Sequence, residues 1–228
     1  MTSASATHVL TRSASRALYA EGDNKFGQIC TGTADSKKGD VHTHNRVLVA
    51  RDVTAFAAGG SLASGHTLFT TGRFGVNSCG CDRWQQLGIG GKVGGAAGYT
   101  WEAGATAQRA PRRVAALEGK EVVDLAAGDD HSAAMLASGE VWTWGRGHVG
   151  QLGRPKQFVS TPAVSPQLSG ARAIAASGDC TCAWLERRGG AQCVGRCAAV
   201  EAALKDALQS KLMQNEQLQQ QQQEQRQQ

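Results

Sequence analysis

Cysteine is the residue type in this chain whose spacing points most directly to chemistry. Four of the seven cysteines lie close together, and they are Cys180, Cys182, Cys193 and Cys197. Four thiolates at such separations can bind zinc tetrahedrally, although structural sites usually leave two to four residues between paired cysteines. A Cys-x-Cys pair strains the chelation of a single metal. We therefore interpret all four as small apolar packing residues and expect no metal and no cofactor, with zinc as the alternative.

A second Cys-x-Cys pair occurs in Cys79-Gly80-Cys81-Asp82, with Arg83 next to it. We place this segment in a long insertion, where it is a candidate redox or partner-contact loop; the alternative is a variable loop without chemistry. The odd number of cysteines and the lack of a secretory signal predict free thiols in an intracellular compartment, cytoplasmic or nuclear. The first sixteen residues are rich in Ser, Thr and Ala and resemble a transit peptide, so mitochondrial import is the alternative.

Two histidines, His8 and His131, occupy the same phase of a repeat described below. A catalytic histidine would be unique, whereas a repeated one is expected to hold the fold together by hydrogen bonds from a buried imidazole. Asp129 and Asp130 are adjacent, so on a strand they would point to opposite faces and make poor acid–base partners. Phosphate-binding glycine loops, nucleophile elbows and zinc-protease motifs are absent from the sequence. These patterns predict a protein that is not an enzyme.

The element that must position these residues is a β-hairpin between Ala126 and Gly153. Its second strand is Val141-Trp142-Thr143-Trp144, which ends at Gly145, and Gly139 marks the turn before it. A lone hairpin is too small to be stable. The chain repeats this hairpin, because a histidine lies fourteen residues before Gly22 just as His131 lies before Gly145.

We find two further copies, one phased on Gly72 and one on Gly195. The four phase glycines are spaced by 50, 73 and 50 residues, and a period near 50 with several short strands is typical of a β-propeller. The sequence therefore predicts an all-β partial propeller of four-stranded blades over residues 8–197. The residues that mark its repeats are His8, Gly22, Gly72, His131, Trp142, Gly145, Gly150, Gln151 and Gly195.

Residues 198–228 have a different character. Four apolar residues follow helical spacing, and they are Val200, Leu204, Leu208 and Leu212. This predicts an amphipathic helix that pairs with another helix or packs on the edge of the last blade. Glutamine dominates from Gln209 onward, which predicts a low-complexity end that is frayed helix or disorder.

The copies at Gly22 and Gly145 resemble the repeat of the regulator of chromosome condensation family. The elements that match are Trp144-Gly145, Gln151-Leu152-Gly153 and Asp23-Asn24-Lys25-Phe26-Gly27-Gln28. The family's fold is a propeller, commonly of seven blades, which at ~50 residues each needs roughly 350 residues. The resemblance therefore implies about three and a half repeats of a partial propeller.

This resemblance implies an interaction scaffold that binds a protein partner. The alternative is nucleotide exchange on a small GTPase, which the family's founding member performs. Candidate contact residues are Tyr99, Trp101, Cys79, Cys81, Asp82 and Arg83, since aromatic residues are favoured interface anchors. The net charge of +5 and the isolated basic pairs do not predict nucleic-acid binding. Because the sequence contains no apolar run near the ~20 residues that span a bilayer, we expect no membrane partner.

Overall fold

The computed structural model describes residues 1–32, 42–72, 75–90, 107–155 and 158–227. The first blade is a sheet of β1 (Thr2–Ala4), β2 (His8–Arg12), β3 (Leu18–Asp23) and β4 (His42–Ala50). The second blade contains β5 (Phe56–Gly59), β6 (His66–Thr71), β7 (Gly75–Cys81) and β8 (Ala107–Arg113). The third contains β9 (Val122–Ala127), β10 (His131–Leu136), β11 (Val141–Arg146) and β12 (Phe158–Val164).

The fourth blade has three strands, which are β13 (Ala171–Ser177), β14 (Cys180–Leu185) and β15 (Gly190–Gly195). Two short 3-10 helices, η1 (Ala115–Leu117) and η2 (Glu186–Arg188), and the C-terminal helix α1 (Glu201–Gln227) complete the described elements. Strands within each blade pair antiparallel in chain order. The predicted all-β partial propeller is confirmed, except that the last blade has three strands instead of four.

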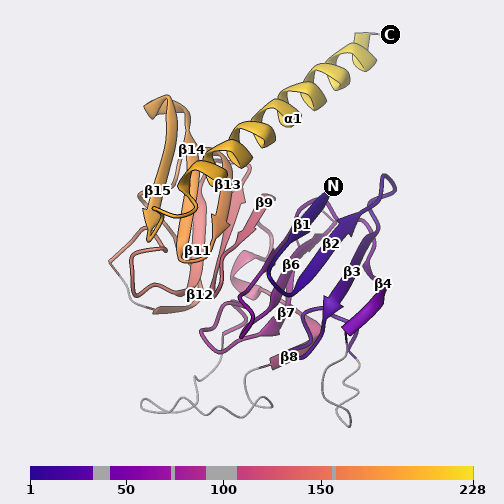
Figure 1. Cartoon of the computed structure of the whole chain (residues 1–228). Coiled ribbons are helices and arrows are strands. Elements are labelled where there is room, and N and C mark those ends of the chain that lie inside the picture. Colours follow the sequence, from indigo (N-terminus) through magenta and orange to yellow (C-terminus); the bar gives the residue numbers. More distant parts are fainter. Residues whose placement is uncertain (33–41, 73–74, 91–106, 156–157, 228) are drawn as a thin grey trace.

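The first strands of the blades line the centre of the propeller. β1, β5, β9 and β13 contact one another in turn, and the sheets follow one another around a common axis (Figure 1). A groove of about 1380 Å³ lies between these inner strands and α1. The first blade begins at Thr2, earlier than the predicted start at His8, because β1 pairs with β2 from Thr2 to Ala4.

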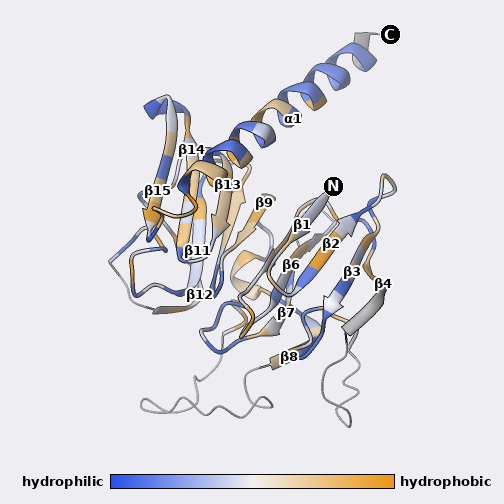
Figure 2. Ribbon diagram, in the orientation of Figure 1, coloured by the Kyte–Doolittle hydropathy of each residue, from blue (hydrophilic) through white to orange (hydrophobic). Residues whose placement is uncertain are grey.

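Apolar side chains fill the space between neighbouring blades. Leu10, Leu18 and Phe69 lie between the first and second blades, and Leu68 and Trp144 lie between the second and third. A third cluster, which includes Ile174 and Leu185, joins the third and fourth. Residues on alternate positions of each strand therefore bury one face against each neighbouring blade. Figure 2 shows hydrophobic residues along the strands of the blades and mainly hydrophilic residues along α1.

Helix α1 covers the outer face of the fourth blade. Leu204 and Leu208 are buried against β13 and β14, with Val200 and Leu212 partly buried beside them. Of the two packing modes expected for this helix, the structure shows packing on the last blade and not on another helix, although α1 lies on the face of that blade and not on its edge. The helix continues through the glutamine-rich segment to Gln227, where disorder or fraying was the expectation, because glutamine is a good helix former. No helix among the described residues is both long and apolar enough to span a membrane.

An ion pair fixes α1 against the third blade as well. The Nζ of Lys211 lies 2.8 and 2.9 Å from the two carboxylate oxygens of Asp124 on β9, and it also donates to the carbonyl of Ile174 at 2.7 Å. The backbone N–H of Ile174 donates to the same carboxylate at 3.2 Å. The ammonium group therefore connects the helix to two blades at once.

We expect Lys211→Ala to destabilise the docking of α1 by about 1–2 kcal/mol, because it removes three charge-assisted hydrogen bonds at a partly buried site. Hydrogen exchange should show faster exchange of the α1 amides near Lys211, with little change in the first blade. The matched control is Lys205→Ala, which breaks only the exposed helical pair with Glu201 and should cost about 0.3 kcal/mol. Equal effects of the two substitutions would contradict this role for Lys211.

Six of the seven cysteines form disulfides: Cys30–Cys79, Cys180–Cys197 and Cys182–Cys193. The expectation of free thiols is wrong for these six, and Cys81 is the free cysteine among the described residues. The reason is spatial, since Cys30 and Cys79 are 49 positions apart in the sequence and meet only because the first two blades stack. The predicted compartment stays a prediction.

Candidate interaction surface at the loop end of the blades

One histidine per blade begins the second strand of each of the first three blades. The strand registers pair His8 with Gly22, His66 with Gly80 and His131 with Gly145. In the fourth blade Cys180 takes the histidine's place and pairs with Gly195. The phase glycine of the second blade is therefore Gly80, and the assignment of Gly72 was wrong because Gly72 lies in the turn after β6. At Gly80 the φ angle is +107°, like the +94° of Gly145.

Each histidine reaches the next blade. The Nε2 atoms of His8, His66 and His131 lie 2.8, 3.0 and 2.7 Å from the hydroxyl oxygens of Thr67, Ser132 and Thr181. Each of these hydroxyls in turn donates to the backbone carbonyl of a glutamine, with distances of 2.6 Å to Gln28, 2.7 Å to Gln86 and 2.8 Å to Gln151. We call this histidine–hydroxyl–carbonyl series the histidine relay.

The relay fixes the tautomer of each ring. A hydroxyl has one proton, and here that proton goes to the glutamine carbonyl, so the imidazole Nε2 must donate to the hydroxyl oxygen. The rings are therefore neutral with the proton on Nε2. Burial lowers the pKa of His66 to about 3 and the pKa values of His8 and His131 to about 4. A ring held neutral by burial and bonded to a hydroxyl of the next blade acts as a link between blades.

The glutamine of each relay also shapes the loop at the same end of the blade. Its side-chain oxygen accepts the backbone N–H of the residue two positions earlier, at 2.9 Å from Phe26, 2.8 Å from Trp84 and 3.0 Å from Val149. Gln28, Gln86 and Gln151 are fully buried. The third strands end just before these loops, and we call this side of the propeller the loop end.

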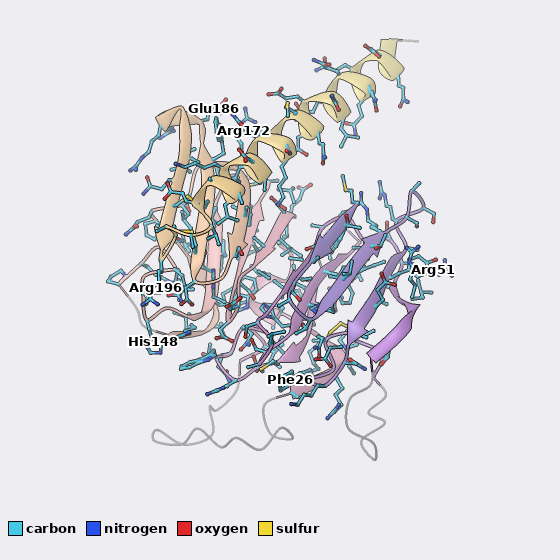
Figure 3. All side chains as sticks on the ribbon, in the orientation of Figure 1. Phe26, Arg51, His148, Arg172, Glu186 and Arg196 are labelled. Carbon is cyan, nitrogen blue, oxygen red and sulfur yellow. A yellow bond between two sulfur atoms is a disulfide. The ribbon has the colours of Figure 1, made fainter. Side chains whose placement is uncertain are left out.

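The three loops present one half-buried apolar side chain each, at the same repeat phase: Phe26, Trp84 and Val149. Figure 3 shows Phe26 and His148 on this end of the molecule, away from Arg172 and Glu186. Leu62, which is 84% exposed, adds a further apolar side chain in the turn between β5 and β6. That turn belongs to the same end, because Gly59 pairs with His66, which pairs with Gly80.

Trp84 lies beside three basic side chains, those of Arg146, Arg83 and His148. The guanidinium carbons of Arg146 and Arg83 lie 5.1 and 5.9 Å from its ring, and the ring of His148 meets it edge-on at 5.3 Å. Arg146 also lies 3.7 Å from the carboxylate of Asp130 and 3.6 Å from that of Asp179. The result is an aromatic side chain beside cations that span the second and third blades.

The acidic residues near Arg146 are partly shielded from water. Burial raises the pKa of Asp130, and a hydrogen bond from Ser64 and the nearby Arg146 oppose that shift. Burial also raises the pKa of Asp129, with the charge of Asp179 as the next cause. These carboxylates therefore balance Arg146, while Arg83 is half-buried and His148 is exposed.

The structure separates the predicted contact residues. Tyr99 and Trp101 lie outside the described residues. Cys79 and Cys81 are buried on β7, within a blade strand instead of an insertion, and burial raises the pKa of the Cys81 thiol to about 11. These two cysteines do not reach the surface.

Asp82 braces its own loop by accepting the backbone N–H of Leu87 at 3.0 Å, and burial raises its pKa to about 6. Arg83, half-buried beside Trp84, is the member of the predicted set at the loop surface.

Of the marked repeat residues, Trp142 packs on the core between the second and third blades under the ammonium of Lys120, and Gly150 has a φ of +85° in its turn.

Sequence reasoning missed Trp84 and the relay partners Thr67, Ser132 and Thr181. The signal was present, because counting fourteen residues from His66 reaches Gly80. That count puts Gln86 in the phase of Gln28 and Gln151, and Trp84 in the phase of Phe26. Thr67 and Thr181 then become recognisable as equivalent positions of neighbouring blades.

Comparison with known proteins agrees with this repeat geometry. The family model described as "Regulator of chromosome condensation (RCC1) repeat" matches residues 75–135 and 138–184, and a second model of the same description matches residues 122–151. The chain carries RCC1 repeats. The matched segments contain the whole of one relay histidine–glycine pair, His131 and Gly145, and the glycine of another, Gly80.

Two curated relatives match this chain over part of its length. Human HERC4, a probable E3 ubiquitin-protein ligase, is 28% identical over 146 residues, which are 64% of this chain and 12% of that protein. The mouse secretion-regulating guanine nucleotide exchange factor is 42% identical over 52 residues, which are 23% of this chain and 11% of that protein. The chain thus spans a small part of these curated relatives.

The RCC1 propeller of Prp20p from Saccharomyces cerevisiae has the same fold. Its structure, described with binding properties to Gsp1p and histones, superimposes with a TM-score of 0.67 at 19% identity. The match covers 86% of this chain and 44% of that one. At this identity the likeness shows the fold, and this chain corresponds to less than half of that chain.

Proposed function

We propose that this chain is a non-enzymatic scaffold whose RCC1 blades bind a protein partner through the loop end. The observation that carries the proposal is the repeated glutamine bond that holds Phe26, Trp84 and Val149 at one phase of three successive blades. A row of apolar side chains on rigid loops costs little conformational entropy to bury, which favours binding.

The side chains at the loop end indicate what kind of partner surface would bind there. Trp and Arg are the residue types that most often dominate binding energy, and Trp84 lies beside Arg83 and Arg146. The partner surface that fits is an apolar patch bordered by acidic residues, because the rim offers Arg83 and His148 to it. Binding is therefore expected to weaken as the salt concentration rises.

We expect Trp84→Ala to weaken binding of a captured partner by roughly thirtyfold, in line with a hot-spot loss of about 2 kcal/mol. Thermal unfolding should change little, since Trp84 is only half-buried. Affinity capture followed by a quantitative binding assay measures the effect. The matched control is Met213→Ala, which removes a 57% exposed apolar side chain from α1 and should leave binding unchanged.

Deletion of residues 91–106, which leaves β8 intact, asks in the same assay whether the Tyr99 and Trp101 segment contributes. Unchanged binding in the deletion variant would restrict recognition to the loop end. If Trp84→Ala and Met213→Ala bind the partner equally well, the loop end is not the contact surface.

Guanine-nucleotide exchange on a small GTPase is the second candidate function. Two names support it: the mouse relative is called an exchange factor, and the Prp20p structure is described with binding to Gsp1p. Purified protein mixed with a panel of GTPases that carry fluorescent nucleotide tests it directly. Nucleotide release at the intrinsic rate across the panel would exclude exchange and leave the scaffold proposal intact.

A further inference from the structure

The four cysteines Cys180, Cys182, Cys193 and Cys197 meet in one cluster between the fourth blade and α1. We call it the cysteine cluster. Cys180 and Cys182 alternate on β14 and point to the face that α1 covers, and Cys193 is the direct cross-strand neighbour of Cys182. Cys197 follows β15 and joins the same group of buried side chains. Two strands and the connection to the helix therefore contribute sulfur atoms to one place.

Three of the four sulfur atoms lie close enough together to share one metal ion, and the fourth, that of Cys197, is bonded to one of them. In the structure the sulfurs are joined in two pairs, Cys180–Cys197 and Cys182–Cys193, and the Sγ atoms of Cys180 and Cys182 are 3.7 Å apart. The ligand atoms of Cys180, Cys182 and Cys193 all lie within 4.8 Å of one another. Zinc–sulfur bonds of about 2.3 Å in tetrahedral geometry separate the sulfurs by about 3.8 Å, which the 3.7 Å between Cys180 and Cys182 matches. Once the disulfides are reduced, the sulfurs within each pair must move apart to the same separation, and that of Cys197 must approach the other three.

We propose that the cysteine cluster, once its two disulfides are reduced, binds one zinc ion through four thiolates. A low-molecular-weight thiol supplies the electrons, and each disulfide then yields two cysteine thiols while two molecules of that thiol become one disulfide. Zinc then displaces four protons as the four cysteines become thiolate ligands. The cluster thus has an oxidised form with two disulfides and a reduced form with a metal.

Burial favours the metal over four free thiols in the reduced form. Cys180 and Cys182 are fully buried and Cys197 is 9% exposed, so after reduction the sulfurs of each pair would have to separate inside a packed interface, and a metal bound to all four would hold them at a defined separation. A structural zinc site with four cysteines is closed, needs no water ligand and fits such a position. The unusual Cys-x-Cys spacing is acceptable here because β15 and the segment after it supply the other two ligands.

The metal would also hold the start of α1. The backbone N–H groups of Val200 and Glu201 donate to the carbonyl oxygen of Cys197 at 2.8 and 2.9 Å. Coordination of the Cys197 sulfur therefore fixes the first turn of the helix, and Leu204 and Leu208 continue the same packed face. Loss of the metal is expected to loosen α1 while the first three blades stay folded.

The test uses the full chain purified in a phosphine reductant after expression in zinc-supplemented medium. Elemental analysis should find about one zinc per chain in the wild type and below roughly 0.2 in Cys182→Ser, because three thiolates hold zinc less tightly than four. The matched control is Cys81→Ser, which removes a buried free thiol outside the cluster and should retain about one zinc per chain.

A second measurement covers the case in which Cys182→Ser fails to fold. Wild-type protein stripped of metal in reductant is titrated with cobalt, and the absorption bands of tetrahedral thiolate cobalt should rise to one equivalent and disappear when zinc is added. The proposal is overturned if reduced, folded protein shows no such bands, or if its four cluster cysteines all react with a thiol reagent in the presence of excess zinc. Persistence of both disulfides in the reductant, seen as a mass four hydrogens lower than that of the thiol form, would overturn it equally.

Discussion

Replacing Gly128 with alanine is expected to destabilise the protein by roughly 3 kcal/mol or more, because the added methyl group would overpack the contact between blades. A Cβ atom at Gly128 would collide with the ring of His131 and lie 2.6 Å from the carbonyl oxygen of Gly178 on the fourth blade. The carbonyl belongs to the backbone and cannot rotate away. Gly128 is thus the position that makes room for the relay histidine of its own blade.

Urea unfolding of Gly128→Ala measures this effect against Gly190→Ala, which is the matched control. Nothing lies within 4 Å of a Cβ at Gly190, so that substitution should change the free energy of unfolding by about 0.5 kcal/mol or less. The same argument applies to Gly59, where the added atom would meet the ring of His66. Similar stabilities for the two alanine variants would show that the blades can separate to accept the methyl group.

Acid should destabilise the protein through the three relay histidines. Their pKa values of about 3 to 4 in the folded state are below the value of about 6.5 in an unfolded chain. Between these values the unfolded chain binds more protons than the folded protein. The contribution of the histidines to the free energy of unfolding is therefore complete above pH 6.5 and is lost as the pH falls below that value. At pH 5 each histidine is expected to cost about 2 kcal/mol relative to pH 7.

Carboxylates oppose this loss. Burial raises the pKa of Asp82 to about 6 and also raises the pKa values of Asp129 and Asp130. A carboxylate whose pKa is raised on folding binds protons better in the folded state, so its contribution to stability rises as the pH falls below about 6. The total pH dependence is therefore smaller than the sum of the three histidine contributions.

A single substitution isolates the histidine contribution. His66→Gln keeps an N–H donor for Ser132 but cannot titrate, so its loss of stability between pH 7 and pH 5 should be about 2 kcal/mol smaller than that of the wild type. Urea unfolding at the two pH values measures the difference, which the carboxylates do not affect. His148→Gln, at an exposed position, should behave like the wild type. Identical pH dependence in the wild type and His66→Gln would contradict a neutral relay.

The fold was predictable from the sequence because copies of the repeat contain the same short pattern of residues. The offset between His8 and Gly22, the same as that between His131 and Gly145, corresponds to a cross-strand pair in each blade. The second blade was harder to phase, because its hairpin turn also contains a glycine, Gly72, directly after an apolar strand. Local pattern cannot distinguish a turn glycine from a strand glycine, whereas the histidine offset can.

The candidate site was less predictable, because it depends on contacts between blades. Trp84 becomes a site residue only when Arg146 and His148 of the next blade are brought to it. The pairing of Cys30 with Cys79 likewise follows from stacking, not from spacing in the sequence. Conversely, the sequence already showed the four cysteines of the cluster as a group. It could not predict which of them pair, or that the Sγ atoms of Cys180 and Cys182, one from each pair, lie 3.7 Å apart.

The histidine relay has a consequence for how the molecule comes apart. Each relay joins a blade to its immediate successor, so the coupling is of the nearest-neighbour kind seen in linear repeat arrays. Between the first two blades the relay through His8 is accompanied by the Cys30–Cys79 disulfide, whereas the relays of His66 and His131 have no disulfide beside them among the described residues. Force applied across the propeller is therefore expected to separate the later blades from one another, while the first two blades stay joined as one covalently linked unit.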